Sequence, residues 1–93
     1  MTVITVLTQT SCAYCDHAEE VLTRLGREHA FRTTEVSLES DHGRELGARL
    51  GVMFAPGILI DGTLFSFGRL SERRLRRELV RRGVPPTSNS SGC

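Results

Sequence analysis

Two cysteines separated by two residues give this chain its clearest chemical signal. Cys12 and Cys15 follow an apolar run at residues 3–7 and precede a stretch with helically spaced apolar residues at 18–25. The free amides at a helix N-terminus favour an anion. Because the thiolate is the form of cysteine that attacks a disulfide, this placement predicts a reactive dithiol.

The spacing assigns a different task to each sulfur. A cysteine at the helix edge can attack a substrate disulfide, and one in the first turn can displace the reduced product from the mixed disulfide. We therefore predict Cys12 as the attacking thiol and Cys15 as the resolving thiol. Asp16 adds a negative charge to the same turn. The predicted pKa of the Cys12 thiol is therefore below the usual value of about 8.5 but not extremely low.

A structural zinc site or two inert buried thiols are the alternative interpretations of this pair. Zinc needs two further ligands, and His17, His29 and His42 show no paired metal-ligand spacing. Three cysteines in a chain with an aliphatic core also do not form a disulfide framework. We therefore favour redox chemistry over zinc.

Length and composition indicate one globular domain. The chain has 93 residues, and its net charge of +1 is too small for a general nucleic-acid footprint, although all twelve basic residues are arginine. No stretch approaches the roughly 18 apolar residues that span a bilayer, and the N-terminus lacks the features of a secretory signal. We expect a cytoplasmic monomer without a nucleic-acid or membrane partner.

The first half of the chain predicts a parallel strand-helix-strand unit. A central strand at 3–7 precedes a helix that ends near Gly26, which would supply a left-handed cap, and a second strand covers 31–38. A short helix capped by Ser40 or Asp41 then ends at Gly51 and carries Leu46 and Leu50 on one face, with Gly43 and Gly47 weakening it.

The second half predicts a hairpin and a final helix. Strands at 57–60 and 63–67 flank Asp61-Gly62, a dipeptide that favours a tight two-residue turn. Ser71 is the expected N-cap of a helix that ends before Gly83. Its inward stripe would consist of Leu75, Leu79 and Val80.

This order of elements, with the cysteine pair at the first strand-to-helix junction, resembles the thioredoxin-like superfamily. The motif Cys12-Ala13-Tyr14-Cys15 and the small size are most similar to a glutaredoxin or glutaredoxin-like protein. The resemblance implies an α/β fold in which about three helices cover a four-stranded mixed sheet. It covers residues 2–83, so we predict one domain at 1–83 and a flexible tail at 84–93.

A second motif supports the resemblance and implies a substrate surface. The run of residues 51–56 is similar to a Gly-Val run that ends in proline just ahead of the family's hairpin. By this similarity Pro56 is a cis-proline that faces the cysteines, and the backbone of Ala55 pairs with an extended substrate. A proline that starts an edge strand is the alternative. Tyr14 would flank a bound thiol or pack over the helix start.

The chain departs from the glutaredoxin pattern in ways that bear on glutathione. Ala13 replaces the usual proline, Thr8 to Thr10 offer no lysine, and Gly68 is followed by Arg69 where the family has a second glycine. Arg69 could replace the missing lysine as a partner for a carboxylate. We therefore expect inefficient use of glutathione.

Two classes of function follow. The first is a thiol-disulfide oxidoreductase that reduces protein or low-molecular-weight disulfides, needs no cofactor, and is recycled by a low-molecular-weight thiol or a flavoprotein reductase. The second is a non-catalytic binding module or a carrier of an iron-sulfur cluster shared between two monomers. The second cysteine favours the oxidoreductase, because resolution needs it. The roles of Cys93 and of the Arg-rich last helix, which could contact an acidic partner or RNA, stay open.

Overall fold

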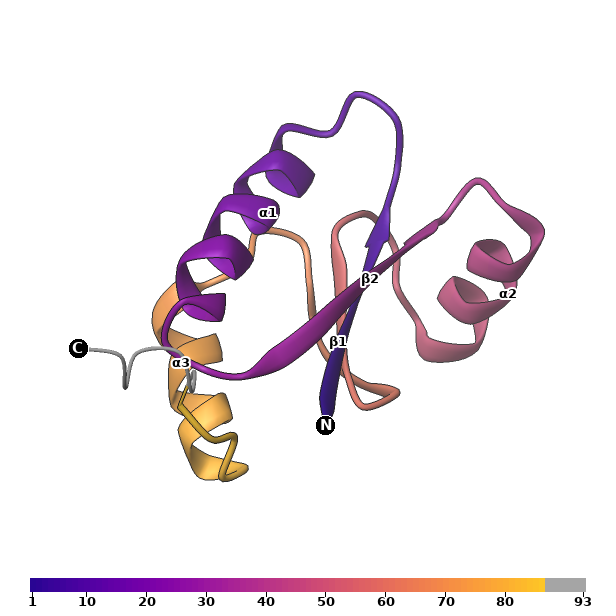
Figure 1. Cartoon of the computed structure of the whole chain (residues 1–93). Helices are drawn as coiled ribbons and strands as arrows, with labels where there is room; N and C mark the ends of the chain where they lie inside the picture. Colours follow the sequence, from indigo (N-terminus) through magenta and orange to yellow (C-terminus); the bar gives the residue numbers. More distant parts are fainter. Residues whose placement is uncertain (87–93) are drawn as a thin grey trace.

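The computed structural model describes residues 1–86 and confirms the predicted α/β architecture (Figure 1). Three helices accompany a four-stranded mixed sheet with the strand order β2-β1-β3-β4. In chain order the elements are β1 (Thr2–Thr8), α1 (Ala13–Gly26), β2 (Phe31–Ser37), α2 (Asp41–Leu50), β3 (Gly57–Ile60), β4 (Thr63–Phe67) and α3 (Glu72–Arg81).

Strand register decides which loops meet. β1 is central and parallel to β2, with Thr8 opposite Ser37 at their carboxyl ends. β3 is antiparallel to β1, so Gly57 at the start of β3 lies opposite Leu7 near the end of β1. Gly57 also pairs with Phe67 at the end of β4. The loops that follow β1 and β4 and the loop that precedes β3 therefore meet at one end of the sheet.

The predicted hairpin turn is confirmed. Asp61 and Gly62 connect β3 to β4 with positive φ angles of 50° and 84°. Both central residues of the tight turn that matches antiparallel strands need this conformation, and an Asp-Gly dipeptide tolerates it.

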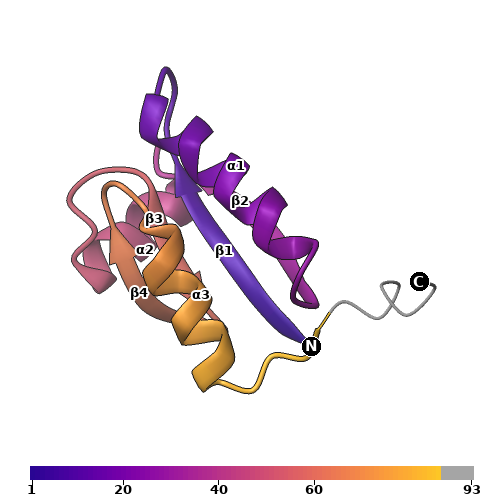
Figure 2. The ribbon, with the colours of Figure 1, turned by 90° about the vertical axis from the view of Figure 1, so that its left-hand side faces the viewer.

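The main core lies between the sheet and two helices. Helices α1 and α3 lie side by side on one face, whereas α2 lies on the other side of the sheet (Figures 1 and 2). The strands contribute Ile4, Val6, Ile58 and Ile60, and the helices contribute Leu22, Leu25, Leu75 and Leu79 among others. Burial of these aliphatic side chains holds α1, and with it the cysteine pair, against the sheet.

The expected left-handed cap at Gly26 is wrong. Gly26 is the last helical residue of α1, and the C-cap is Arg27 with φ −77° in the right-handed region. The chain continues in right-handed turns because the N–H groups of Glu28 and His29 both donate to the Leu25 carbonyl. These bonds satisfy the helix end without a left-handed residue.

The two glycines of α2 are contact positions. Gly43 and Gly47 are the buried residues of this helix, whereas Leu46 and Leu50 are half-buried. A Cβ at Gly43 would overlap the Ser37 carbonyl oxygen at the end of β2. The glycines that lower helix propensity therefore allow α2 to approach the sheet closely. The predicted N-cap Ser40 is confirmed, and the helix ends at Gly51 as predicted, with Gly51 in the left-handed region.

Helix α3 begins as predicted but faces the core differently. The Ser71 hydroxyl oxygen accepts the N–H of Arg74 at 3.2 Å, and Leu75 and Leu79 are fully buried. Val80, predicted to face inward, is 63% exposed. A helix turns about 100° per residue, so Val80 points away from the core when Leu79 is buried in it. Val84 packs in the core instead.

Residues 84–86, which the sequence assigned to the tail, contact the domain. Val84 is buried, and the Ala30 N–H donates to the Pro85 carbonyl at 2.8 Å. Pro86 forms an isolated β-bridge with His29. The rest of the predicted tail, with Cys93, lies outside the described residues.

The close approach of α2 is tested by replacing each of its glycines with alanine. Gly43→Ala is expected to lower the free energy of unfolding by about 2 kcal/mol, because overpacking against backbone outweighs the gain in helix propensity of about 1 kcal/mol. Gly47→Ala is the matched control, since its Cβ would meet the flexible end of Leu38 at 3.1 Å. Urea unfolding measures both variants, and equal effects would contradict this account.

Candidate active site

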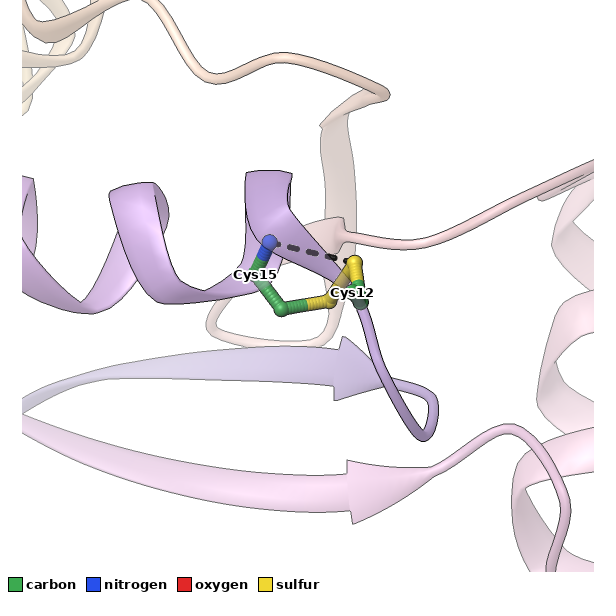
Figure 3. Close-up of a disulfide and its surroundings, with 2 residues drawn as sticks. All are labelled: Cys12 and Cys15. Atoms are coloured by element: carbon green, nitrogen blue, oxygen red, sulfur yellow. Dashed lines mark hydrogen bonds between the residues drawn. A yellow bond between two sulfur atoms is a disulfide. The ribbon is translucent and has the colours of Figure 1, made fainter.

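The cysteine pair lies at the end of the sheet where the loops meet. Cys12 and Cys15 form a disulfide with their Cα atoms 5.2 Å apart. Figure 3 shows this disulfide at the first turn of α1, beside the carboxyl ends of two strands. The sequence prediction that a strand hands over to a helix at the two sulfurs is confirmed.

Cys12 is the N-cap of α1. Its backbone is extended, with φ −117° and ψ 103°, and its Sγ accepts the N–H of Cys15 at 3.1 Å (Figure 3). The Cys12 carbonyl oxygen accepts from Cys15 at 3.1 Å and from Asp16 at 3.2 Å. A sulfur in this position occupies the place of a capping oxygen, and the helix dipole favours negative charge there.

The two sulfurs differ in their access to solvent. Cys15 is only 4% exposed and lies among the buried residues of α1, whereas Cys12 is partly exposed. A reagent in solution therefore reaches Cys12 first. The attacking role predicted for Cys12 needs this access, and the roles of the two sulfurs stay a prediction.

The loop that carries Cys12 is tied to the loop after β2. The Thr10 hydroxyl donates to Glu39 Oε1 at 2.7 Å, and the Leu38 N–H donates to the Thr8 carbonyl at 2.7 Å. Ser11, which lies between Thr10 and Cys12, has a positive φ of 54°. These contacts fix the entry to α1, and the sequence did not reveal them because the partners are 29 and 30 residues apart.

The Ala55–Pro56 peptide bond is cis, as the resemblance implied. Both residues are buried, and the Pro56 carbonyl accepts the N–H of Gly68 at 2.9 Å. No hydrogen bond joins the backbone of Ala55 to another residue of 1–86. The Ala55 backbone is therefore unpaired at the end of the sheet where β3 begins.

An exposed aromatic pair, which the sequence reading missed, adjoins this segment. Phe54 and Phe67 pack edge to face with ring centroids 5.2 Å apart. Gly68 has φ 87°, and a Cβ there would lie 3.1 Å from the Phe54 ring, so glycine suits both the backbone and the contact. Phe54 and Tyr14 remain about half exposed. The available signal was an aromatic residue directly before Ala55 and another before Gly68.

The remaining candidate residues lie around the start of α3. His17 and Arg69 line one depression together with Leu70, Ser71 and Glu72. Arg69 is exposed. Within residues 1–86 no three His, Cys, Asp or Glu side chains are grouped to hold a metal ion.

A family model described as a thioredoxin domain matches residues 2–81. The chain belongs to this thioredoxin domain family. It is 24% identical over 82 residues to a probable thioredoxin of Archaeoglobus fulgidus, with 88% of this chain and 89% of the relative covered. An uncharacterized protein of Mycobacterium bovis is 33% identical over 92 residues, with 89% and 90% covered.

Solved structures agree on the fold of this thioredoxin domain. A mutant thioredoxin from Halobacterium salinarum gives a TM-score of 0.62 at 20% identity, with 82% of this chain and 69% of that chain covered. Glutaredoxin 1 from Francisella tularensis gives 0.54 at 17% identity, with 88% and 99% covered. The predicted superfamily is therefore confirmed, together with a cysteine pair at disulfide distance in a thioredoxin fold.

Ion pairs join the two helices that cover the core. Arg24 of α1 contacts Glu72 of α3 at 2.8 Å, and Arg76 contacts Glu28 at 3.1 Å and Glu72 at 3.3 Å. The hydrogen bond from Arg24 lowers the pKa of Glu72. A carboxylate with a lowered pKa stabilises the fold above its usual value of 4.5 and loses that contribution as pH falls.

A carboxyl pair between α1 and β2 has the opposite effect, because it raises a pKa and destabilises the charged form. Glu35 accepts or donates a hydrogen bond with Glu19 and repels its charge, and both effects raise the pKa of Glu19. The two side chains line one depression with Val6, Leu22 and two threonines.

In no helix of residues 1–86 is there a stretch long and apolar enough to cross a membrane.

Removal of this repulsion is expected to stabilise the domain in a pH-dependent way. Above the raised pKa of Glu19 its carboxylate is charged beside Glu35 and the repulsion destabilises the fold, and this penalty is lost as pH falls below the ordinary value of 4.5. Glu35→Gln should therefore raise the Tm by a small amount at pH 7 and leave it unchanged at pH 3. Circular dichroism melts measure this effect.

Glu45→Gln, on the exposed side of α2, is the matched control and should change the Tm little at either pH. An equal rise for Glu35→Gln at both pH values would contradict the assignment to charge repulsion.

Proposed function

We propose that this thioredoxin domain is a thiol-disulfide oxidoreductase in which Cys12 attacks and Cys15 resolves. The observation that carries the proposal is the capping contact, in which the partly exposed Cys12 Sγ accepts a helix N–H while Cys15 is buried behind it. A hydrogen bond to the thiolate lowers the pKa of the thiol, and the helix dipole acts in the same direction. Exposed Asp16 opposes this effect within the same turn.

The reaction begins from the reduced dithiol. The Cys12 thiolate attacks one sulfur of the substrate disulfide, forms a mixed disulfide and expels the other sulfur as a thiolate. Cys15 loses its proton and attacks Cys12 Sγ, which expels the second substrate thiolate and leaves the Cys12–Cys15 disulfide. Two electrons pass to the substrate, and two protons complete its thiols.

Substrate binds across the residues at the same end of the sheet. The free backbone of Ala55 beside cis Pro56 pairs with an extended segment, and Tyr14 flanks the attacked sulfur. Gly68 donates its N–H to the Pro56 carbonyl at 2.9 Å and so holds the chain before α3 against this segment. Arg69 offers a charge to a substrate carboxylate.

The substrates are protein or low-molecular-weight disulfides in the cytoplasm, and the protein acts as a monomer. Its reductant is a low-molecular-weight thiol or a flavoprotein reductase. Gly68-Arg69 replaces the pair of glycines typical of glutaredoxins, and no lysine precedes Cys12. A glutaredoxin-like mechanism with inefficient use of glutathione fits these residues.

The nucleophile is tested by ultraviolet thiolate absorbance of the reduced protein. The Cys12 thiol is expected to titrate at least about one pH unit below 8.5. Cys12→Ser should abolish this low step, and its partner variant Cys15→Ser should keep it. The reverse result, or two thiols that titrate like those of an unfolded peptide, would contradict the assignment.

The activity is tested by a recycling assay with glutathione, another small thiol and a flavoprotein reductase in parallel. Cys15→Ser should accumulate mixed disulfides with its substrates, and Cys12→Ser should accumulate none. A visible iron-sulfur band in freshly purified protein, together with no mixed disulfide, would favour the cluster carrier instead.

A further inference from the structure

The exposed side of α3 carries arginines that the fold does not neutralise. Arg73, Arg74 and Arg77 are exposed, as is Arg69 just before the helix. No hydrogen bond or ion pair joins these four guanidinium groups to residues 1–86. We call these four residues the basic face.

The acidic residues of α3 are already paired elsewhere. Glu72 contacts Arg24 and Arg76, and Glu78 contacts Arg81 and Arg82. Those contacts to Glu78 lower its pKa to about 2. Each carboxylate of the helix is thus shared by two other arginines. The charge of the basic face is therefore available to a partner.

The basic face begins at the end of the sheet that carries Cys12 and Cys15. Arg69 follows Gly68, which lies at the sheet end beside Pro56, and α3 runs from there along the outside of the molecule next to α1 (Figure 2). Arg73 and Arg77 are one helical turn apart and lie on one side of α3. Exposed Val80, a further three residues along, lies on that side too. A chain bound at the cysteines can continue directly onto this surface.

We propose that the basic face is the docking surface for an acidic segment of the disulfide-bearing protein on which Cys12 acts. Guanidinium groups bind carboxylates with two parallel hydrogen bonds, and exposed Val80 adds an apolar contact. This inference rests on the proposed function, because a protein disulfide brings the segment to the site. RNA is disfavoured since residues 72–81 contain no aromatic side chain on which bases could stack.

Two synthetic peptides test the proposal. Each carries one cysteine as a mixed disulfide with thionitrobenzoate and a tail of four glutamates or four glutamines, placed before or after the cysteine. The reduced protein should release thionitrobenzoate from the glutamate peptide about fivefold faster at low salt, which corresponds to two exposed ion pairs. The advantage should vanish at about 0.5 M salt, where charges are screened beyond about 4 Å.

The double variant Arg73→Gln/Arg77→Gln should lose the advantage and reduce the glutamine peptide at the wild-type rate. Arg27→Gln/Arg32→Gln removes the same charge from the opposite end of the sheet, where Arg32 pairs with Val3, and should keep the advantage. Equal rates for the two peptides in the wild-type protein, or an advantage that survives in Arg73→Gln/Arg77→Gln, would overturn the inference.

Other outcomes are equally decisive. Tighter binding of a short single-stranded RNA than of the glutamate peptide would overturn the inference in favour of nucleic acid. A dimer that Arg73→Gln/Arg77→Gln dissociates would assign the face to a second copy of the chain. If the glutamine peptide releases no thionitrobenzoate, the proposed function itself fails.

Discussion

The first turn of α1 has backbone N–H groups without helical partners, and a sulfur atom satisfies one of them. Cys12 supplies its carbonyl oxygen and its Sγ to the N–H of Cys15, each at 3.1 Å. Most helices take a hydroxyl or carboxylate oxygen for this purpose, as α2 and α3 do with Ser40 and Ser71. In α1 the same atom, Cys12 Sγ, caps the helix and forms the disulfide with Cys15.

This arrangement depends on a sheet that brings separate loops together. The Thr8–Ser37 and Leu7–Gly57 pairings place three loops at one end of the molecule. Apolar burial under α1 and α3 holds the helix start in place, and the bond from Thr10 to Glu39 fixes the loop that enters it. Packing and hydrogen bonds therefore hold Cys12 Sγ at the helix start, while Tyr14 beside it remains about half exposed.

Local signals in the sequence were sufficient for the elements and for the cysteine pair. The Asp61-Gly62 turn, the serine caps and the apolar runs all act over a few residues, so they could be read without a structure. The cis bond before Pro56 was predicted from the family resemblance, because a proline in the sequence by itself favours the trans form.

Features that depend on tertiary contacts could not be read in this way. Gly43 appeared as a weak helix residue because its close approach to Ser37 is set by packing. Val80 was predicted to face inward beside Leu79, but the core space next to this helix is filled by Val84, which the sequence placed in the tail. The Phe54–Phe67 pair joins the loop before β3 to the end of β4, which only the hairpin brings together.

The difference in exposure between the two sulfurs also bears on oxidative damage. A peroxide in solution meets the partly exposed Cys12 before the buried Cys15. Oxidation of Cys12 to a sulfenic acid places an electrophilic sulfur within reach of its neighbour, and condensation of the two releases water and gives the disulfide. The domain thus has an internal route that intercepts Cys12 before it reaches the irreversible sulfinic and sulfonic states.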